Sequence, residues 1–209
     1  MDDLSPANVT TLVLRTDADV TEGTSDGDAD ITVTNLAIDS DDGVNIDVDV
    51  TKLAVSNSAA GGVDITDTAG GLTVDSVATS TGNIAGVSTA GGNITLVATS
   101  PLVVNEAVAD TGGGNIVLTA SGSTAADDLT LNANVTASGG NGNITFNAGD
   151  QIIHNVASAV STAGTGTITY TAGAGTTTGD ITVSGTITSN SGIVSLSAPA
   201  GVTLSLIHI

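Results

Sequence analysis

The chain has 209 residues, of which 40% are hydrophobic and only 1% aromatic, and its net charge is −20 because it carries 22 acidic and 2 basic residues. The basic residues are Arg15 and Lys52. A surface with so few cations does not neutralise phosphates, which excludes nucleic acids and anionic membrane surfaces as direct partners. The absence of cysteine excludes a disulfide scaffold, a zinc ribbon and a thiol enzyme.

Residues 1–60 form an acidic region. Residues 1–50 hold 13 of the 22 acidic residues, yet apolar residues alternate with polar ones at 31–38, 44–50 and 52–56. Such alternation is typical of strands with one buried face. We interpret residues 1–60 as acidic, diverged copies of the repeats that fill the rest of the chain.

Six aspartates of this region form two clusters on glycine-containing turns. They are Asp26, Asp28, Asp30, Asp39, Asp41 and Asp42. Clustered carboxylates supply the oxygen ligands that Ca²⁺ prefers, so these residues are calcium candidates. Their spacing does not follow the EF-hand order, and the glycine-rich calcium repeat GGxGxD is incomplete at 139–144. The alternative is a solvated acidic face that keeps molecules apart.

A short phrase recurs five times between residues 92 and 198. It reads Gly, any residue, Ile or Val, any residue, Leu, Phe or Tyr, any residue, Ala. The copies are 92–98, 114–120, 142–148, 166–172 and 192–198. The alternation predicts a half-buried strand in each copy. The predicted inward residues of the first three copies are Ile94, Leu96, Ala98, Ile116, Leu118, Ala120, Ile144, Phe146 and Ala148.

A second phrase with alternating apolar residues falls between copies of the first, at 71–77, 101–108, 128–135, 150–156 and 180–187. Clusters of Gly, Asn, Ser and Thr separate the phrases and indicate turns. The repeat is therefore two or three short strands in about 25 residues. We predict an all-β, right-handed parallel β-helix, or β-solenoid, with regular repeats over 61–203. An antiparallel β-sandwich, which also uses regularly spaced short strands, is the alternative.

Stacking of like phrase on like phrase predicts ladders of equivalent residues. Ile94, Ile116 and Ile144 would lie above one another, and Phe146 would contact Tyr170 in the next coil. A further ladder concerns the asparagines that recur at one phrase position, where we expect side-chain amides to bond to one another or to support the turn. These asparagines are Asn93, Asn115 and Asn143.

Residues that would mark an enzyme are sparse. His154 lies within a strand phrase, and the adjacent Asp127 and Asp128 would face opposite sides of a strand or sit in the turn before Leu129. The remaining motifs of polysaccharide-cleaving β-helix enzymes do not occur. We therefore expect no catalytic residues and no enzyme activity, with a carbohydrate-active β-helix enzyme as an alternative.

The C-terminal segment, 204–209, reads LSLIHI and breaks the preceding pattern. It matches the conceptual translation of a common transposase sequencing adapter. We expect a non-native tail here, with the natural protein continuing beyond residue 203. No stretch of about 18 apolar residues occurs, so membrane insertion is not expected.

The segments GGNITLVA, GGGNIVLTA, DDLTLNANVTAS, NGNITFNAG and VDITDTAGGLTV resemble repeats of large bacterial surface proteins of the filamentous-haemagglutinin type. Autotransporter passenger domains use a similar repeat style. The resemblance covers about residues 44–203. It implies export across a Gram-negative outer membrane, a long β-helical stalk, and a role in adhesion or biofilm formation. The family's Asn-Pro motif is absent near the start, which suggests an interior fragment.

The sequence therefore predicts a structural stalk segment of a secreted or cell-surface bacterial adhesin. The parent protein would bind molecules of a host or neighbouring cell. The first alternative is the carbohydrate-active enzyme, and the second is an adhesion module stiffened by calcium. Since a solenoid cut between coils leaves unpaired strand edges, we also expect the isolated fragment to associate end to end.

Overall fold

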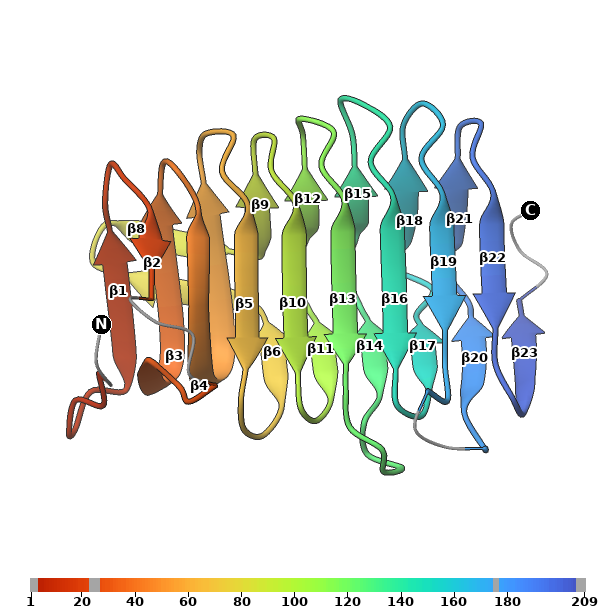
Figure 1. Cartoon of the computed structure of the whole chain (residues 1–209), viewed down its shortest axis with the longest axis horizontal. Coiled ribbons are helices and arrows are strands. Elements are labelled where there is room, and N and C mark those ends of the chain that lie inside the picture. The colour runs from red at the N-terminus through yellow and green to blue at the C-terminus, as the bar shows by residue number, and fades with distance from the viewer. Residues whose placement is uncertain (1–3, 23–26, 175–176, 206–209) are drawn as a thin grey trace.

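The computed structural model describes residues 4–22, 27–174 and 177–205. Within these residues it is all β without helices, and one sheet of 21 strands contains only parallel pairings. The chain winds with three strands to a coil, which confirms the predicted parallel β-helix (Figure 1). It runs down the near side of Figure 1, returns upward behind and advances to the right, so the coil is right-handed.

Strands of successive coils stack in three columns. The first column contains β5 (Val63–Asp67), β10 (Ile94–Ala98), β13 (Ile116–Ala120), β16 (Ile144–Ala148), β19 (Ile168–Thr171) and β22 (Val194–Ser197). The second contains β6 (Leu72–Val74), β11 (Leu102–Val104), β14 (Leu129–Leu131), β17 (Ile152–His154), β20 (Asp180–Val183) and β23 (Gly201–Leu204). The third contains β9 (Val87–Thr89), β12 (Val108–Asp110), β15 (Val135–Ala137), β18 (Ala159–Thr162) and β21 (Thr186–Ser189).

The N-terminal coils continue the same columns, but Ile31–Ser40 and Val44–Asn57 are longer strands with fewer turns between them. Their strands are β1 (Thr11–Arg15), β2 (Val20–Thr21), β3 (Ile31–Ser40) and β4 (Val44–Asn57). The single strand β4 pairs in turn with β5, β6 and β9, so it runs along all three sides of its coil. The coil that separates the partners Ile31 and Val48 is shorter than the one that separates Ile94 and Ile116. The shorter coil still turns at a glycine, since Gly43 precedes the first-column part of β4 with a φ of +128°.

The predicted ladders of core residues are present. Ile94 pairs with Ile116 and Ile116 with Ile144, and all three are fully buried. In the neighbouring ladder, Phe146 pairs with Tyr170. Their ring centroids lie 4.7 Å apart with planes tilted by 59°, a favourable arrangement for two aromatic rings. The core is thus a stack of like residues in which the only two aromatic side chains contact each other.

The asparagine column both forms a ladder and supports the turn. The backbone N–H and side-chain amide of Asn115 both donate to Oδ1 of Asn93, at 2.9 and 3.2 Å. Asn143 makes the same two bonds to Asn115, at 2.9 and 3.1 Å. Each asparagine thereby satisfies a backbone donor at the corner that precedes the first-column strand of the next coil.

A second polar column lies inside the solenoid, at the corner between the third and first columns. Its buried members are Ser40, Asn57, Thr89, Asp110 and Thr162. Asp110 accepts the backbone N–H of Gly113 at 2.7 Å, and the Thr162 hydroxyl donates to the carbonyl of Gly166 at 2.9 Å. These side chains satisfy turn backbone groups that would otherwise be buried without partners.

Leu118→Ala tests the ladder core. Leu118 is fully buried between Leu96 and Phe146, so its truncation leaves a cavity. We expect the free energy of unfolding, measured with urea, to fall by about 2–5 kcal/mol. Val117→Ala, on the outward side of the same strand, is the control and should change it by less than about 1 kcal/mol. Equal effects of the two substitutions would contradict the inward register of β13.

Candidate functional site

The most distinctive local feature is a hairpin that leaves the solenoid between β6 and β9. Strands β7 (Ser76–Thr79) and β8 (Gly82–Ala85) pair antiparallel, the only such pairing among the described residues. A tight turn joins them, and Gly82 follows that turn with a φ of +132°, which strongly favours glycine. In Figure 1 the hairpin, in yellow, extends back behind the N-terminal coils.

The hairpin lies on a small apolar patch outside the solenoid. Val77 and Ile84, one from each strand, are 3% and 9% exposed. They pack against Ala37, Ala54 and Val13, which are aligned outward residues of β3, β4 and β1. The alanines let the hairpin approach the sheet closely, and the contact forms a second hydrophobic cluster separate from the main core.

Both basic residues of the chain hold this hairpin in place. Lys52 Nζ lies 2.8 Å from Oδ2 of Asp75 at the base of the hairpin. The bond from Lys52, and one from the backbone N–H of Ser76, lower the pKa of Asp75. Near the tip, Nη2 of Arg15 donates to the Thr79 hydroxyl at 3.0 Å. Arg15 Nε also lies 3.6 Å from Oδ2 of Asp39.

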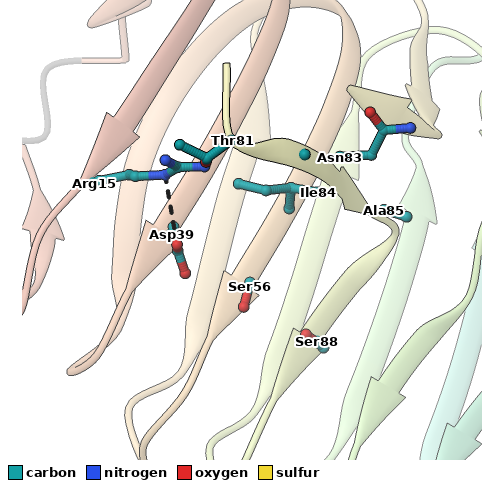
Figure 2. Close-up of a pocket in the computed structure, with 9 residues that line it drawn as sticks. Arg15, Asp39, Ser56, Thr81, Asn83, Ile84, Ala85 and Ser88 are labelled. Atoms are coloured by element: carbon teal, nitrogen blue, oxygen red, sulfur yellow. Dashed lines mark ion pairs between the residues drawn. The ribbon is translucent and has the colours of Figure 1, made fainter. Parts of the chain in front are cut away.

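A trough of about 510 Å³ lies beside the hairpin. Figure 2 shows β8 as one wall and a row of outward side chains as the floor. These side chains belong to β1, β3, β4 and β9. The floor residues are Arg15, Asp39, Ser56 and Ser88. The floor therefore offers a guanidinium at one end and small hydroxyl groups at the other, a lining suited to polar contacts.

The calcium candidates are spread around β3. Asp26 lies outside the described residues. Asp28 and Asp30 precede β3, whereas Asp39, Asp41 and Asp42 lie at or just beyond its other end. Among the residues that the structure describes, no three His, Asp or Glu side chains are grouped to hold a metal ion.

The aspartates beyond β3 have separate surroundings. The Ser58 hydroxyl donates to Asp41, and Asp39 faces Arg15. Asp42 lines a different shallow groove together with Asp19 and Asp64. The structure thus brings some of these carboxylates near other polar groups, but it does not gather the described members of the two predicted clusters into one site.

His154 is an interior residue. Its ring is fully buried, and the hydroxyl of Tyr170 donates to Nδ1 at 3.0 Å. Nε2 lies 3.2 Å from the carbonyl oxygen of Ser158, which can only accept, so the neutral ring carries its proton on Nε2 and leaves Nδ1 to accept from Tyr170. Burial lowers the pKa of His154 and raises that of Tyr170. Both ring nitrogens are therefore used within the core, and the network satisfies two polar side chains there.

Asp127 and Asp128 lie in the turn before β14, which is one of the two positions predicted from the sequence. Asp127 is buried and accepts bonds from the backbone N–H and hydroxyl of Thr124, at 2.5 and 2.8 Å. Asp128 accepts the backbone N–H of Gln151 at 3.1 Å. Burial raises the pKa of Asp128, and these bonds tie both carboxylates to local turn geometry.

A buried carboxylate occurs where the following coils carry alanine. Asp67 is fully buried, and its register partner in β10 is Ala98. Oδ1 accepts the backbone N–H of Val50 at 3.1 Å, while Oδ2 has no hydrogen-bond partner. Burial raises the pKa of Asp67 to about 6; the Val50 bond partly offsets this effect, and the charge of Asp49 adds to it.

Comparison of the chain with models of protein families, with curated proteins and with solved structures finds no match in any of the three. Across the described part of the chain, no helix is long and apolar enough to cross a membrane. The candidate site therefore rests on its own geometry. Its hairpin was not anticipated from the sequence, although Gly82 and the two isolated cations mark the residues that shape it.

Lys52→Ala tests the clamp on the hairpin. Removing the ion pair with the partly exposed Asp75 should weaken docking by about 0.2–1 kcal/mol. Amide hydrogen exchange of Val77 and Ile84 should then accelerate up to about fivefold, because opening of the hairpin becomes easier. Exchange in β13 is the internal control and should stay unchanged. Equal acceleration in β13 and the hairpin would indicate global destabilisation and contradict a local clamp.

Asp67→Asn tests the buried carboxylate. The folded-state pKa of about 6 exceeds the ordinary value of 3.8, so between these values the folded chain binds a proton that the unfolded chain releases. Stability is therefore lost as pH rises through this window, by about 3 kcal/mol in total. The free energy of unfolding of the variant, minus that of the wild type, should rise by about 2 kcal/mol, most of this amount, between pH 4 and pH 7.

The matched control is Asp64→Asn, an exposed residue on the same strand β5. Its difference from the wild type should vary far less across the same pH range. If the Asp67→Asn difference were independent of pH, Asp67 would not hold a buried proton in the folded state.

Proposed function

We propose that the chain is a structural stalk segment of a secreted or cell-surface adhesin of a Gram-negative bacterium. The observation that carries the proposal is the continuous parallel ladder that links β1 to β23 through all three columns. Each coil adds one strand spacing, about 4.8 Å, to the length of the rod. The first column, followed from β2 through β4 to β22, makes seven such steps, or roughly 34 Å.

The ladder suits a load-bearing spacer for a physical reason. Hydrogen bonds between strands point along the axis of the rod, so tension along that axis is shared by three columns of bonds. The apolar interior keeps water away from the inner side of these bonds. The repeat phrases support the same proposal, since they resemble those of the filamentous-haemagglutinin type.

The surface charge fits a segment that keeps its neighbours at a distance. A net charge of −20 on 209 residues favours solubility and discourages association between parallel rods. Receptor contacts with a host or neighbouring cell would then be made by the parent protein, to which this segment contributes length and rigidity.

A surface-display experiment tests the stalk. The full chain is inserted between an epitope tag and an outer-membrane barrel in a Gram-negative display strain. We expect the tag to label on intact cells and to stand roughly 30–40 Å further from the membrane than without the insert, because the coils stack at about 4.8 Å. Energy transfer from a dye on the tag to a membrane dye measures this distance.

The control insert carries Ile116→Asp and Leu118→Asp, which place two charges in the ladder core. This insert should be degraded or give no extension. A wild-type insert that is likewise degraded, or that leaves the tag near the membrane, contradicts the proposal. Extension that is lost in a calcium chelator would instead favour the calcium-stiffened module, and cleavage of an added acidic polysaccharide would favour the enzyme.

A further inference from the structure

The trough beside the hairpin has an open strand edge as its wall. Gly86 N–H donates to the carbonyl of Asp75 at 3.2 Å, and this bond sets the alternation along the hairpin. Because bonded pairs recur every second residue in an antiparallel ladder, Ile84 and Gly82 bond to β7. Asn83 and Ala85 therefore direct their N–H and C=O groups away from β7.

These outward groups have no internal partner. Asn83 and Ala85 are exposed, β8 pairs with β7 alone, and no turn or loop bond joins the backbone of these two residues to another residue in the described ranges. Both residues line the trough, and Figure 2 shows them on the strand above the floor. The wall thus presents two donors and two acceptors at the spacing of a strand that lacks its next neighbour.

The dimensions of the trough fit a short extended chain. The floor residues come from four successive coils, so the floor spans three strand spacings, or roughly 14 Å. About four extended residues, at about 3.3 Å each, cover that length. Ser56 and Ser88 are small and leave room above the floor for the side chains of such a segment.

The position of Arg15 at one end of the trough determines which end of a bound segment would carry a negative charge. Arg15 is the one basic residue in the lining, and it lies near the hairpin tip. Its guanidinium carries five N–H donors, of which one is bonded to Thr79 and one faces Asp39. The remaining donors suit a carboxylate at that end of a bound segment.

We propose that β8 is a docking edge for an extended polypeptide segment of about four residues with small side chains and a carboxylate group at the Arg15 end. The segment adds a third strand to the hairpin sheet, crossing the solenoid strands above Ser56 and Ser88. Affinity comes from main-chain hydrogen bonds, and the small floor residues and Arg15 set the side-chain preference.

The test begins with a random heptapeptide library displayed on phage and panned against the full chain. Enriched peptides are synthesised, and their dissociation constants are measured by fluorescence anisotropy. We expect enriched sequences to combine small residues with an aspartate or glutamate. Replacing that acidic residue by its amide should weaken binding about threefold to tenfold.

Ala85→Pro removes one outward N–H of β8 without breaking a hydrogen bond of the hairpin. We expect it to weaken peptide binding at least tenfold. The matched control is Ala78→Pro on the opposite edge, since Ala78 pairs with Asn83 and also points its N–H away from its partner strand. That variant should bind within about twofold of the wild type.

A bulky substitution on the floor of the trough provides an independent test. Ser88→Tyr should block the trough, whereas Ala109→Tyr, at the register partner of Ser88 in the next coil, lies outside the lining and should not. Hydrogen exchange of Ile84 verifies that each variant keeps its hairpin docked. The proposal is overturned if no peptide is enriched over background, or if enriched peptides bind the Ala85→Pro and Ser88→Tyr variants as tightly as the wild type.

Discussion

The structure depends on parallel hydrogen bonding between equivalent strands of successive coils. Because each strand sits directly on its counterpart, the side chain at one position meets the same position of the next coil, as Ile94 meets Ile116. A shift of one residue would turn every apolar side chain of that strand outward. The register thus determines the apolar core, the asparagine ladder and the polar inner corner together.

The sequence predicts the parts of the fold that repeat. Like residues at a fixed position, such as Ile116 and Ile144, indicated the stacks and their inward faces, and the contact between Phe146 and Tyr170 followed from the same alignment. The hairpin could not be predicted in this way because it occurs once. Its packing on the large sheet depends on Ala37 and Ala54, whose outward positions are determined by pairing with strands distant in sequence. Asp67 was missed for a different reason: alternation from Val63 and Ile65 places position 67 inside, but an aspartate is not expected at a core position.

The two cations of this acidic chain lie close to one surface feature, the hairpin. Nearly all charged groups repel one another, yet Arg15 and Lys52 both lie against the hairpin and its surroundings. An ion pair beside a partly covered surface is screened less than a fully exposed pair. The hairpin region is consequently where positive and negative side chains lie next to one another, and Arg15 and Asp39 also line the trough.

The length of a coil varies while its rise along the axis does not. The number of residues from Val55 to Val87 is almost twice the number from Ile31 to Val48, yet in each case the two residues are paired on adjacent parallel strands of the same sheet. Extra residues project outward from the solenoid at a corner, as the hairpin between β6 and β9 does. A gene for such a rod can therefore gain or lose a whole coil by recombination between repeats, or acquire an insertion at a corner, and the coils on either side still stack. Surface features can in this way change from one lineage to another while the rod beneath them is preserved.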